Sequence, residues 1–273
     1  MFTLNCKGRL LTADKPLVMG IINCTPDSFY SGSRHQDVDA IIKEAARMMN
    51  DGATILDIGG QSTRPGSDKI PAEEELQRVI PAIEAVSKAI PEAFISVDTY
   101  YSRVAAEAVA AGACIVNDIS AGKMDENLIA TIASLKVPYV LMHMQGTPQT
   151  MQQEPHYDNV TREVLDFLIQ QTAVLKEKGI TDIITDPGFG FGKTIAHNLE
   201  LLRNLELFKM TGRPLLLGIS RKSFIYKTLG TTAADVLNGT TVMNTIGLMR
   251  GAAILRVHDV KEAAEAVKLY TAV

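Results

Sequence analysis

The feature that most constrains the fold is a regular alternation of eight short apolar runs with amphipathic stretches of helical length. The apolar runs lack the polar–apolar alternation of half-exposed strands, so they are typical of parallel strands buried on both faces. The helical pattern is clearest at 39–52, 73–90 and 162–179, and the first and last of these stretches end at a glycine that can cap a helix. The apolar runs lie at 17–23, 53–60, 93–98, 114–118, 138–144, 182–186, 215–220 and 253–259.

Eight consecutive strand–helix units favour a (β/α)8 TIM barrel of the α/β class over a doubly wound sheet. No low-complexity segment or Gly/Ser-rich linker divides the 273 residues, so the sequence predicts a single barrel domain, 1–273. The first residues, FTLNCKGRLL, carry no helical pattern. They predict a short N-terminal β-hairpin that closes the bottom of the barrel.

Polar residues end all eight apolar runs. In a barrel the C-terminal ends of the strands meet at one mouth, where active sites are built. Any one of these residues can instead cap the following helix, but eight together predict a shared pocket. They are Asn23, Asp57, Asp98, Asn117 with Asp118, His143, Asp186, Ser220 with Arg221 and Lys222, and Arg256 with His258.

The stretch DPGFGFGKT (186–194) ends like a phosphate-binding P-loop but does not satisfy that motif. A P-loop needs a glycine five residues before Gly192, and Pro187 stands there. The dinucleotide fingerprint G-x-G-x-x-G also fails, because Lys193 occupies the position of its last glycine. The stretch therefore predicts neither a P-loop NTPase nor a Rossmann enzyme, and its first residue, Asp186, becomes the candidate ligand-binding group.

Composition and charge exclude several classes of partner. A net charge of −4 gives no reason to expect a nucleic acid. No apolar run is long enough to span a bilayer, and the N-terminus lacks the apolar core of a signal peptide, so no membrane partner is expected. Three widely spaced cysteines, Cys6, Cys24 and Cys114, predict a reduced, cytoplasmic setting without a disulfide framework or a structural zinc ion.

Seven separate motifs, in the same order along the chain, resemble those of the dihydropteroate synthases. The resemblance extends from about residue 17 to the end of the chain. It implies the (β/α)8 fold and a reaction that joins a dihydropterin carrying a hydroxymethyl pyrophosphate to para-aminobenzoate, giving dihydropteroate for folate synthesis. The motifs are NCTPDSF (23–29), GGQSTRPG (59–66), SVDTY (96–100), VND (116–118), DPGFGFGK (186–193), SRKS (220–223) and RVHD (256–259).

The strand-end residues suit a pterin. Its amino-oxo pyrimidine edge presents an N–H and an NH₂ side by side, which the Asp186 carboxylate can accept bidentately, while Asn117 offers both a donor and an acceptor. The resemblance implies that Asp98 contacts the other side of the pterin and that Lys222 reaches its oxo and N5 region. It also implies catalytic roles for Asp98, Lys222 and Arg256, the last of which flanks the pterin ring.

Release of pyrophosphate requires anion-binding groups and a metal ion. Arg256 and His258 stand two residues apart in the last apolar run, so both are expected on one face of that strand. Asn23 offers a neutral oxygen to Mg²⁺, which takes few protein ligands and completes its shell with water and phosphate oxygens. By resemblance, the C–O bond breaks before the arylamine attacks, and the pyrophosphate-binding residues are Asn23, Thr63, Arg64, Arg256 and His258.

The segments 24–35 and 60–70 contain glycine and proline and are expected to be loops that close over the substrates. The resemblance departs from the family pattern at two positions. Gln61 stands where relatives often carry glutamate, and Ser31 stands where they often carry aspartate. By resemblance, the aminobenzoate-binding residues are Thr63, Pro65, Phe191, Lys222 and Ser223.

Two other functions remain open at this point. A pterin-dependent methyltransferase domain shares the barrel and the pterin-binding Asp and Asn residues, but it needs no pyrophosphate site. A non-catalytic pterin-binding paralogue would be expected to have lost some of the pyrophosphate-binding or loop residues. The expected helix of the seventh unit, 233–252, has an apolar surplus, and that of the eighth, EAAEAVKLYTAV, is alanine-rich, so both predict an interface. The resemblance implies twofold homodimers formed through these helices.

Overall fold

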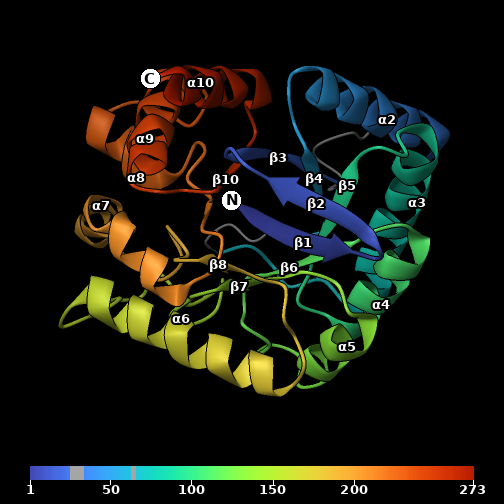
Figure 1. Cartoon of the computed structure of the whole chain (residues 1–273), viewed down its shortest axis with the longest axis horizontal. Coiled ribbons are helices and arrows are strands. Elements are labelled where there is room, and N and C mark those ends of the chain that lie inside the picture. The colour runs from blue at the N-terminus through green and yellow to red at the C-terminus, as the bar shows by residue number, and fades with distance from the viewer. Residues whose placement is uncertain (25–33, 63–65) are drawn as a thin grey trace.

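The computed structural model describes residues 1–24, 34–62 and 66–273, and the side chains of 34–37 are not among those described. Eight parallel strands form a barrel surrounded by helices (Figure 1). The strands are β3 (Leu17–Asn23), β4 (Ile55–Gly59), β5 (Phe94–Asp98), β6 (Ile115–Asp118), β7 (Tyr139–Met142), β8 (Ile183–Asp186), β9 (Leu216–Leu217) and β10 (Ile254–Val257).

Hydrogen bonding runs through the sheet in the order β8-β7-β6-β5-β4-β3-β10-β9. A parallel bridge between Thr185 and Leu215 then brings β9 beside β8 and closes the ring. The predicted (β/α)8 TIM barrel is therefore confirmed. The helices are α2 (Arg34–Asn50), α3 (Ala72–Ala89), α4 (Ser102–Ala111), α5 (Leu128–Leu135), α6 (Val160–Glu177), α7 (Ile195–Arg203), α8 (Ser223–Leu229), α9 (Leu237–Met249) and α10 (Val260–Ala272), with a 3-10 helix η1 (Leu205–Thr211).

Burial explains why the strand runs show no alternation in the sequence. Every residue of β4, β6, β7 and β8 is buried. One face of each strand fills the barrel interior and the other is covered by helices, so both faces require apolar side chains. Polar residues are then tolerated mainly where a strand ends.

The predicted N-terminal hairpin is present as β1 (Phe2–Cys6) and β2 (Arg9–Ala13), which pair antiparallel. Lys7 and Gly8 form its turn with φ of 53° and 85°, the positive values that a two-residue hairpin of matching twist requires. Leu4 and Leu11 pack with the residues at the starts of the barrel strands. Figure 1 shows the hairpin lying across this end of the barrel, so the functional mouth is at the opposite end.

The seventh unit differs from the sequence prediction. Only Leu216–Leu217 of the run 215–220 form a strand, and α9 begins at Leu237 instead of at residue 233. Pro214 cannot donate to the sheet. A Cβ built on Gly218 would lie 3.7 Å from Asp186 Oδ2, so the chain passes close to the mouth where it leaves the sheet.

Candidate active site

An acidic cluster occupies one side of the barrel mouth. Arg256 extends from β10, and its Nε donates to Asp57 Oδ2 at 2.6 Å while its Nη2 donates to Asp98 Oδ2 at 2.6 Å. Asn117 Nδ2 donates to the same Asp57 oxygen at 3.0 Å. Side chains from β4, β5, β6 and β10 are thus in direct contact. Asp57 is fully buried, and its Oδ1 accepts no hydrogen bond from the residues that the structure describes.

The cluster contains two carboxylates and one guanidinium. Burial raises the pKa of Asp98 to about 7, with Arg256 opposing that shift and Asp57 adding to it. Burial also disfavours the charge on Arg256, but Asp57 and Asp98 outweigh it and raise the pKa of the guanidinium. Arg256 therefore stays charged, while Asp98 can exchange a proton near neutrality.

The opposite balance is found around β8. Asp186 ends that strand, and its Oδ1 accepts from the Gly188 amide at 2.7 Å. Burial raises the pKa of Asp186, with Lys222 opposing the shift. Burial lowers the pKa of Lys222 to about 8, with Asp186 opposing it. Lys222 Nζ donates to the Phe189 carbonyl and lies 4.6 Å from the centre of the Phe191 ring.

The glycine-rich turn after Asp186 explains the false resemblance to a P-loop. Its three glycines have φ between 66° and 83°, a region that side-chain-bearing residues rarely adopt. A Cβ on Gly188 would lie 1.9 Å from the His143 carbonyl oxygen, and one on Gly192 would lie 2.4 Å from that of Gln145. The glycines therefore let the turn pack closely against the chain that follows β7. Phe191 is buried in a small apolar cluster with Tyr100, Ile119, Met142 and Met151.

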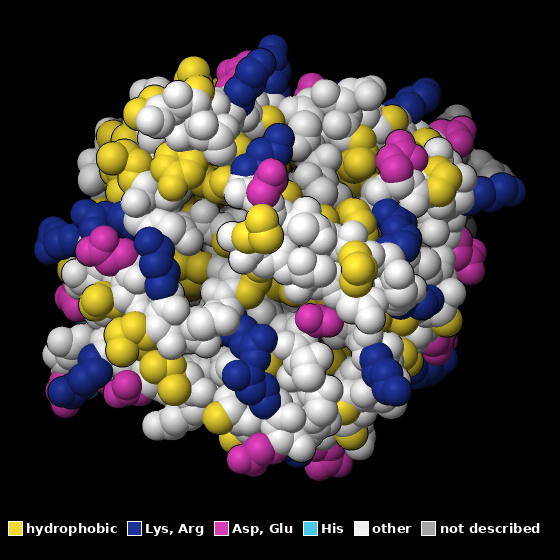
Figure 2. All heavy atoms as spheres, in the orientation of Figure 1, with side chains coloured by type: hydrophobic (Ala, Val, Ile, Leu, Met, Phe, Trp, Pro, Cys, Tyr) yellow, Lys and Arg dark blue, Asp and Glu magenta, His cyan; other side chains and the backbone are white. Residues whose placement is uncertain are grey.

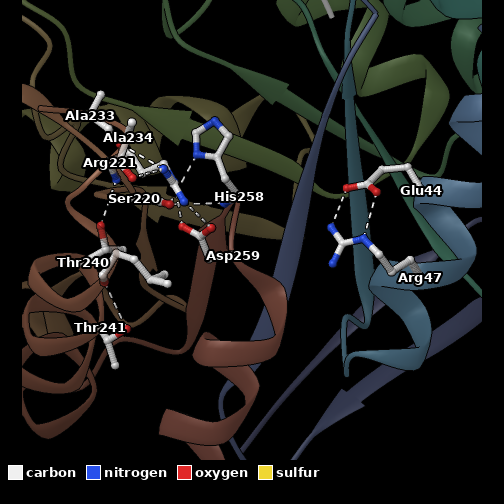
Figure 3. A network of polar contacts seen from close by, with 11 residues as sticks. Glu44, Arg47, Ser220, Arg221, Ala233, Ala234, Thr240, Thr241, His258 and Asp259 are labelled. Atoms are coloured by element: carbon white, nitrogen blue, oxygen red, sulfur yellow. Dashed lines mark hydrogen bonds and ion pairs between the residues drawn. The ribbon is translucent and has the colours of Figure 1, made fainter. Parts of the chain in front are cut away.

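The exits of β9 and β10 are tied together, as Figure 3 shows. His258 donates its backbone N–H to Ser220 Oγ at 3.2 Å, and its Nδ1 lies 3.3 Å from the same oxygen. Arg221 Nε and Nη2 donate to the two carboxylate oxygens of Asp259 at 2.9 and 2.8 Å. Arg221 has a φ of 55°, which is uncommon for a residue with a side chain. This paired fork holds the turn that directs Lys222 toward Phe189.

The remaining predicted residues have varied positions. Asn23 is half-buried at the end of β3, in register with Gly59. Ser223 opens α8, directly after Lys222. His258 follows β10 by one residue, so the prediction that it lies on the last strand was one residue too long. Thr63, Arg64, Pro65 and Ser31, with most of the first predicted loop, lie outside the described residues.

Sequence reasoning missed three features of this region. Asp57 was recognised as a strand-end residue but was given no role, and it is the most buried partner of Arg256. His143 lies at the end of β7, but its Nδ1 faces Lys193 Nζ at 3.0 Å. Only its position at a strand end marked it in the sequence. For Lys193, nothing in the sequence indicated a role once the P-loop motif was excluded.

Gln61, one of the two departures from the family pattern, is buried. Its Nε2 donates to Glu75 Oε2 at 3.1 Å, and its Oε1 accepts from the Tyr100 hydroxyl at 2.8 Å. Burial raises the pKa of Glu75 to about 8, and the charge of Asp98 adds to the shift. An amide at 61 serves both neighbours at once, whereas a glutamate would place a second carboxyl group against Glu75.

A model of the protein family described as pterin binding enzyme matches residues 19–258. The chain therefore belongs to the family of pterin-binding enzymes. The dihydropteroate synthase of Escherichia coli (strain K12) is 45% identical over 271 residues, covering 98% of this chain and 95% of that protein. Within the family, this chain groups with the dihydropteroate synthases.

Solved structures agree. The dihydropteroate synthase of Xanthomonas albilineans with 4-aminobenzoic acid has a TM-score of 0.92 at 42% identity, covering 99% of this chain and 97% of that one. The enzyme from the same organism in complex with 7,8-dihydropteroate has a TM-score of 0.89 at 40% identity, covering 99% and 98%. Among the described residues of the present chain, no helix is long and apolar enough to cross a membrane.

Proposed function

We propose that this chain condenses 6-hydroxymethyl-7,8-dihydropterin pyrophosphate with para-aminobenzoate to give 7,8-dihydropteroate and pyrophosphate. The observation that carries the proposal is the convergence of Asp57, Asp98, Asp186, Lys222 and Arg256 from five parts of the chain on one barrel mouth. Relatives with 40–45% identity over nearly the whole chain are named dihydropteroate synthase, and structures of one of them have been solved with 4-aminobenzoic acid and with 7,8-dihydropteroate.

Asp186 is oriented for the pterin before the ligand arrives, because the Gly188 amide holds its Oδ1. Its buried charge is costly in the absence of donors. The two N–H groups of the pyrimidine edge supply such donors. Asn117, held by Asp57, and Asp98, held by Arg256, would contact other parts of the ring. Lys222 would exchange the Phe189 carbonyl for the oxo and N5 region of the pterin.

The bond to pyrophosphate breaks first in this proposal, and the arylamine nitrogen then attacks the pterin-stabilised cation. The acidic cluster stabilises that cation, because two carboxylates face one guanidinium. Arg256, which its neighbours keep charged, stabilises the negative charge that grows on the departing pyrophosphate. His258 would bind the same pyrophosphate, together with Thr63 and Arg64.

Mg²⁺ belongs to the proposal as a partner of the pyrophosphate. Asn23 supplies one neutral oxygen, and the described residues contain no group of three or more His, Cys, Asp or Glu side chains placed to hold a metal ion. Such a donor set fits an ion held mostly by phosphate oxygens and water. When bound, Mg²⁺ would offset charge on the leaving group. Phe191, Lys222 and Ser223, with Thr63 and Pro65, would receive the aminobenzoate.

The test is direct. The purified protein is incubated with dihydropterin pyrophosphate, para-aminobenzoate and Mg²⁺, and dihydropteroate is measured. Product formation is the expected result. A protein that binds pterin without making dihydropteroate would be a non-catalytic pterin-binding paralogue. Methyl transfer from a methylated pterin, without condensation, would identify a pterin-dependent methyltransferase domain.

We also propose a homodimer in a cytoplasmic setting. Figure 2 shows hydrophobic side chains gathered over the region of α8 and α9. The three cysteines are all buried and unpaired, in keeping with a reducing compartment. Sedimentation at micromolar concentration is expected to give twice the chain mass of 29.6 kDa, and a species of that single mass would contradict the dimer. The exposed apolar side chains on α8, α9 and α10 are Leu229, Val242, Met249, Leu269 and Tyr270.

A further inference from the structure

Lys193 is a buried ammonium group that the proposed chemistry does not use. The residue is only 2% exposed and lies in the glycine-rich turn that follows Asp186. Nζ lies 3.0 Å from each of three atoms: the Gly188 carbonyl oxygen, the Phe191 carbonyl oxygen and His143 Nδ1. An ammonium group has three N–H donors, so these neighbours satisfy all of them.

His143 is suited to accept the third hydrogen bond. Burial, with the nearby charge of Lys193, lowers the pKa of His143 to about 2, so the imidazole is neutral. A neutral imidazole has one bare nitrogen, and Nδ1 serves as that acceptor. A buried lysine without partners would be strongly destabilising. Here the ammonium has three hydrogen-bond partners, two of which are carbonyls of the turn itself.

The turn is held by side chains along its whole length. Lys193 takes two of its carbonyls, on either side of the one that Lys222 takes. The carbonyls of all seven residues from 188 to 194 accept from side-chain donors, which in order are Lys193, Lys222, Gln152, Lys193, Tyr157, Asn198 and Asn198.

The two carbonyls that Lys193 binds belong to Gly188 and Phe191, the residues that link the turn to the expected substrate sites. Gly188 also donates its amide to Asp186 Oδ1, so the residue that Lys193 holds is the residue that orients the pterin carboxylate. Phe191 carries the aromatic ring beside Lys222 Nζ. One ammonium group therefore connects the expected pterin-binding carboxylate with the expected wall of the aminobenzoate site.

We infer that Lys193 is a positioning residue for both substrates, which fixes Asp186 for the pterin and Phe191 for the arylamine without touching either ligand. This inference rests on the proposed synthase activity. It accounts for the lysine of the GKT sequence, which ends the turn as a P-loop lysine would but points into the protein instead of toward a phosphate.

Lys193→Met removes the ammonium and keeps a long apolar side chain. We expect the dissociation constant of the pterin and the KM for para-aminobenzoate both to rise by roughly 10- to 100-fold, the scale of a misplaced binding group. Pyrophosphate affinity is expected to change less than about threefold, because Arg256 on β10 and His258 directly after it do not belong to this turn. Calorimetry and steady-state kinetics measure these constants.

Tyr139→Phe is the matched control. It removes another buried hydrogen bond, from the Tyr139 hydroxyl to Asp118 Oδ2 at 2.7 Å, without touching the turn. It is expected to lower the melting temperature and to leave the pterin and aminobenzoate constants unchanged. If Lys193→Met behaved in the same way, with lower stability but native constants, Lys193 would be merely structural and the inference would be wrong.

A double variant covers the case in which Lys193→Met does not fold. Adding His143→Leu removes the imidazole nitrogen that the first change leaves unpaired, and replacing both members of that one hydrogen bond by apolar groups reduces the destabilisation. We expect the double variant to fold and to retain the loss of substrate binding. Native binding by the double variant would overturn the inference. Failure of the unmutated protein to make dihydropteroate would instead contradict the proposed function.

Discussion

The barrel mouth has two halves with opposite charge balance. The acid-rich half, formed by Asp57, Asp98 and Arg256, places two carboxylates around one guanidinium. The lysine-rich half, formed by Asp186, Lys193 and Lys222, places two ammonium groups near one carboxylate. Both halves are largely buried, so neither imbalance is screened by water as it would be on the surface.

The difference teaches how one pocket can serve a cation and an anion in the same reaction. In the proposed reaction, the surplus negative charge of the acid-rich half would favour a cationic pterin, and the surplus positive charge of the lysine-rich half would favour oxo groups and a carboxylate. Burial also brings the pKa values of three of these groups close to neutral pH. Burial moves the pKa of Asp98 up to about 7 and those of Lys193 and Lys222 down to about 7 and about 8.

Asp186→Asn is the change expected to break the lysine-rich half most severely. It replaces a carboxylate acceptor by an amide whose NH₂ faces the N–H groups of the pterin, and it leaves two lysines without their counter-charge. We expect pterin binding to weaken by about 2–4 kcal/mol, or roughly 30- to 1,000-fold. Isothermal calorimetry with an oxidised pterin measures this directly, and an unchanged affinity would remove Asp186 from the role.

Arg256→Lys tests the acid-rich half. Lysine keeps the charge but lacks the planar fork that reaches two carboxylates at once. We expect turnover to fall more than about tenfold, at the low end of the loss seen when one preorganised donor is removed. Pterin affinity measured without pyrophosphate should change little, because the lysine-rich half is intact. Normal turnover by this variant would show that Arg256 does not stabilise the leaving group.

The structure supplies a control for that experiment. A lysine cannot pair with both Asp57 and Asp98, so Arg256→Lys leaves a buried carboxylate uncompensated and lowers stability. Asp57→Asn in the same chain removes the surplus charge. The double variant is expected to regain melting temperature but not turnover. Recovery of both would mean that the loss came from folding, and the two halves would then differ in stability instead of in chemistry.

The sequence predicted the fold well because strands that are buried on both faces consist almost entirely of apolar residues, and such runs can be recognised directly in the sequence. The eight runs, the hairpin and the polar strand ends were all visible. The seventh strand was overestimated, since only Leu216–Leu217 form a strand while the whole run 215–220 is largely apolar. Apolar character marks burial, but it does not mark where hydrogen bonding to a neighbouring strand stops.

The site was predictable only in part. Asp98 and Asp186 end strands of the barrel, and Asn117 and Arg256 stand next to last in theirs, so all four meet at its mouth. The roles of Lys193 and His143 could not be predicted, because their contact joins positions fifty residues apart and depends on how a turn of positive-φ glycines packs. Pairwise side-chain contacts across a barrel have no local signature in one sequence.

Glu75→Gln is expected to have the smallest effect, and it tests whether the acids and the lysines of the mouth change protein stability in opposite directions with pH. Burial raises the pKa of Asp98, in the acid-rich half, from 3.8 to about 7 and that of Glu75, which feels the charge of Asp98, from 4.5 to about 8. Between those values the folded protein binds more protons than the unfolded chain, so the free energy of unfolding decreases as the pH rises from about 4 to about 8. This stability is fully present below the unfolded values.

The two lysines of the lysine-rich half have the opposite effect on stability. Burial lowers the pKa of Lys193 from 10.5 to about 7 and that of Lys222 from 10.5 to about 8. Over that range the unfolded chain binds more protons, so these two groups make the free energy of unfolding increase as the pH rises from about 7 to about 10.5. Glu75 and Asp98 on one side and the two lysines on the other therefore act in adjacent pH windows, and the combined contribution of these four groups to stability is lowest near pH 7 to 8.

Glu75→Gln removes one acidic contribution without changing a lysine. Its amide oxygen can still accept from Gln61 and Thr99, as the carboxylate does at 3.1 and 3.2 Å. We expect the fall in melting temperature between pH 5 and 8 to shrink by a few degrees, roughly 1 kcal/mol in a domain of this size, while the rise above pH 8 persists. Thermal unfolding followed by circular dichroism gives both slopes. Parallel curves for the variant and the unmutated protein would show that Glu75 keeps an ordinary pKa. The proposed pH dependence on the acidic side of the mouth would then rest on Asp98.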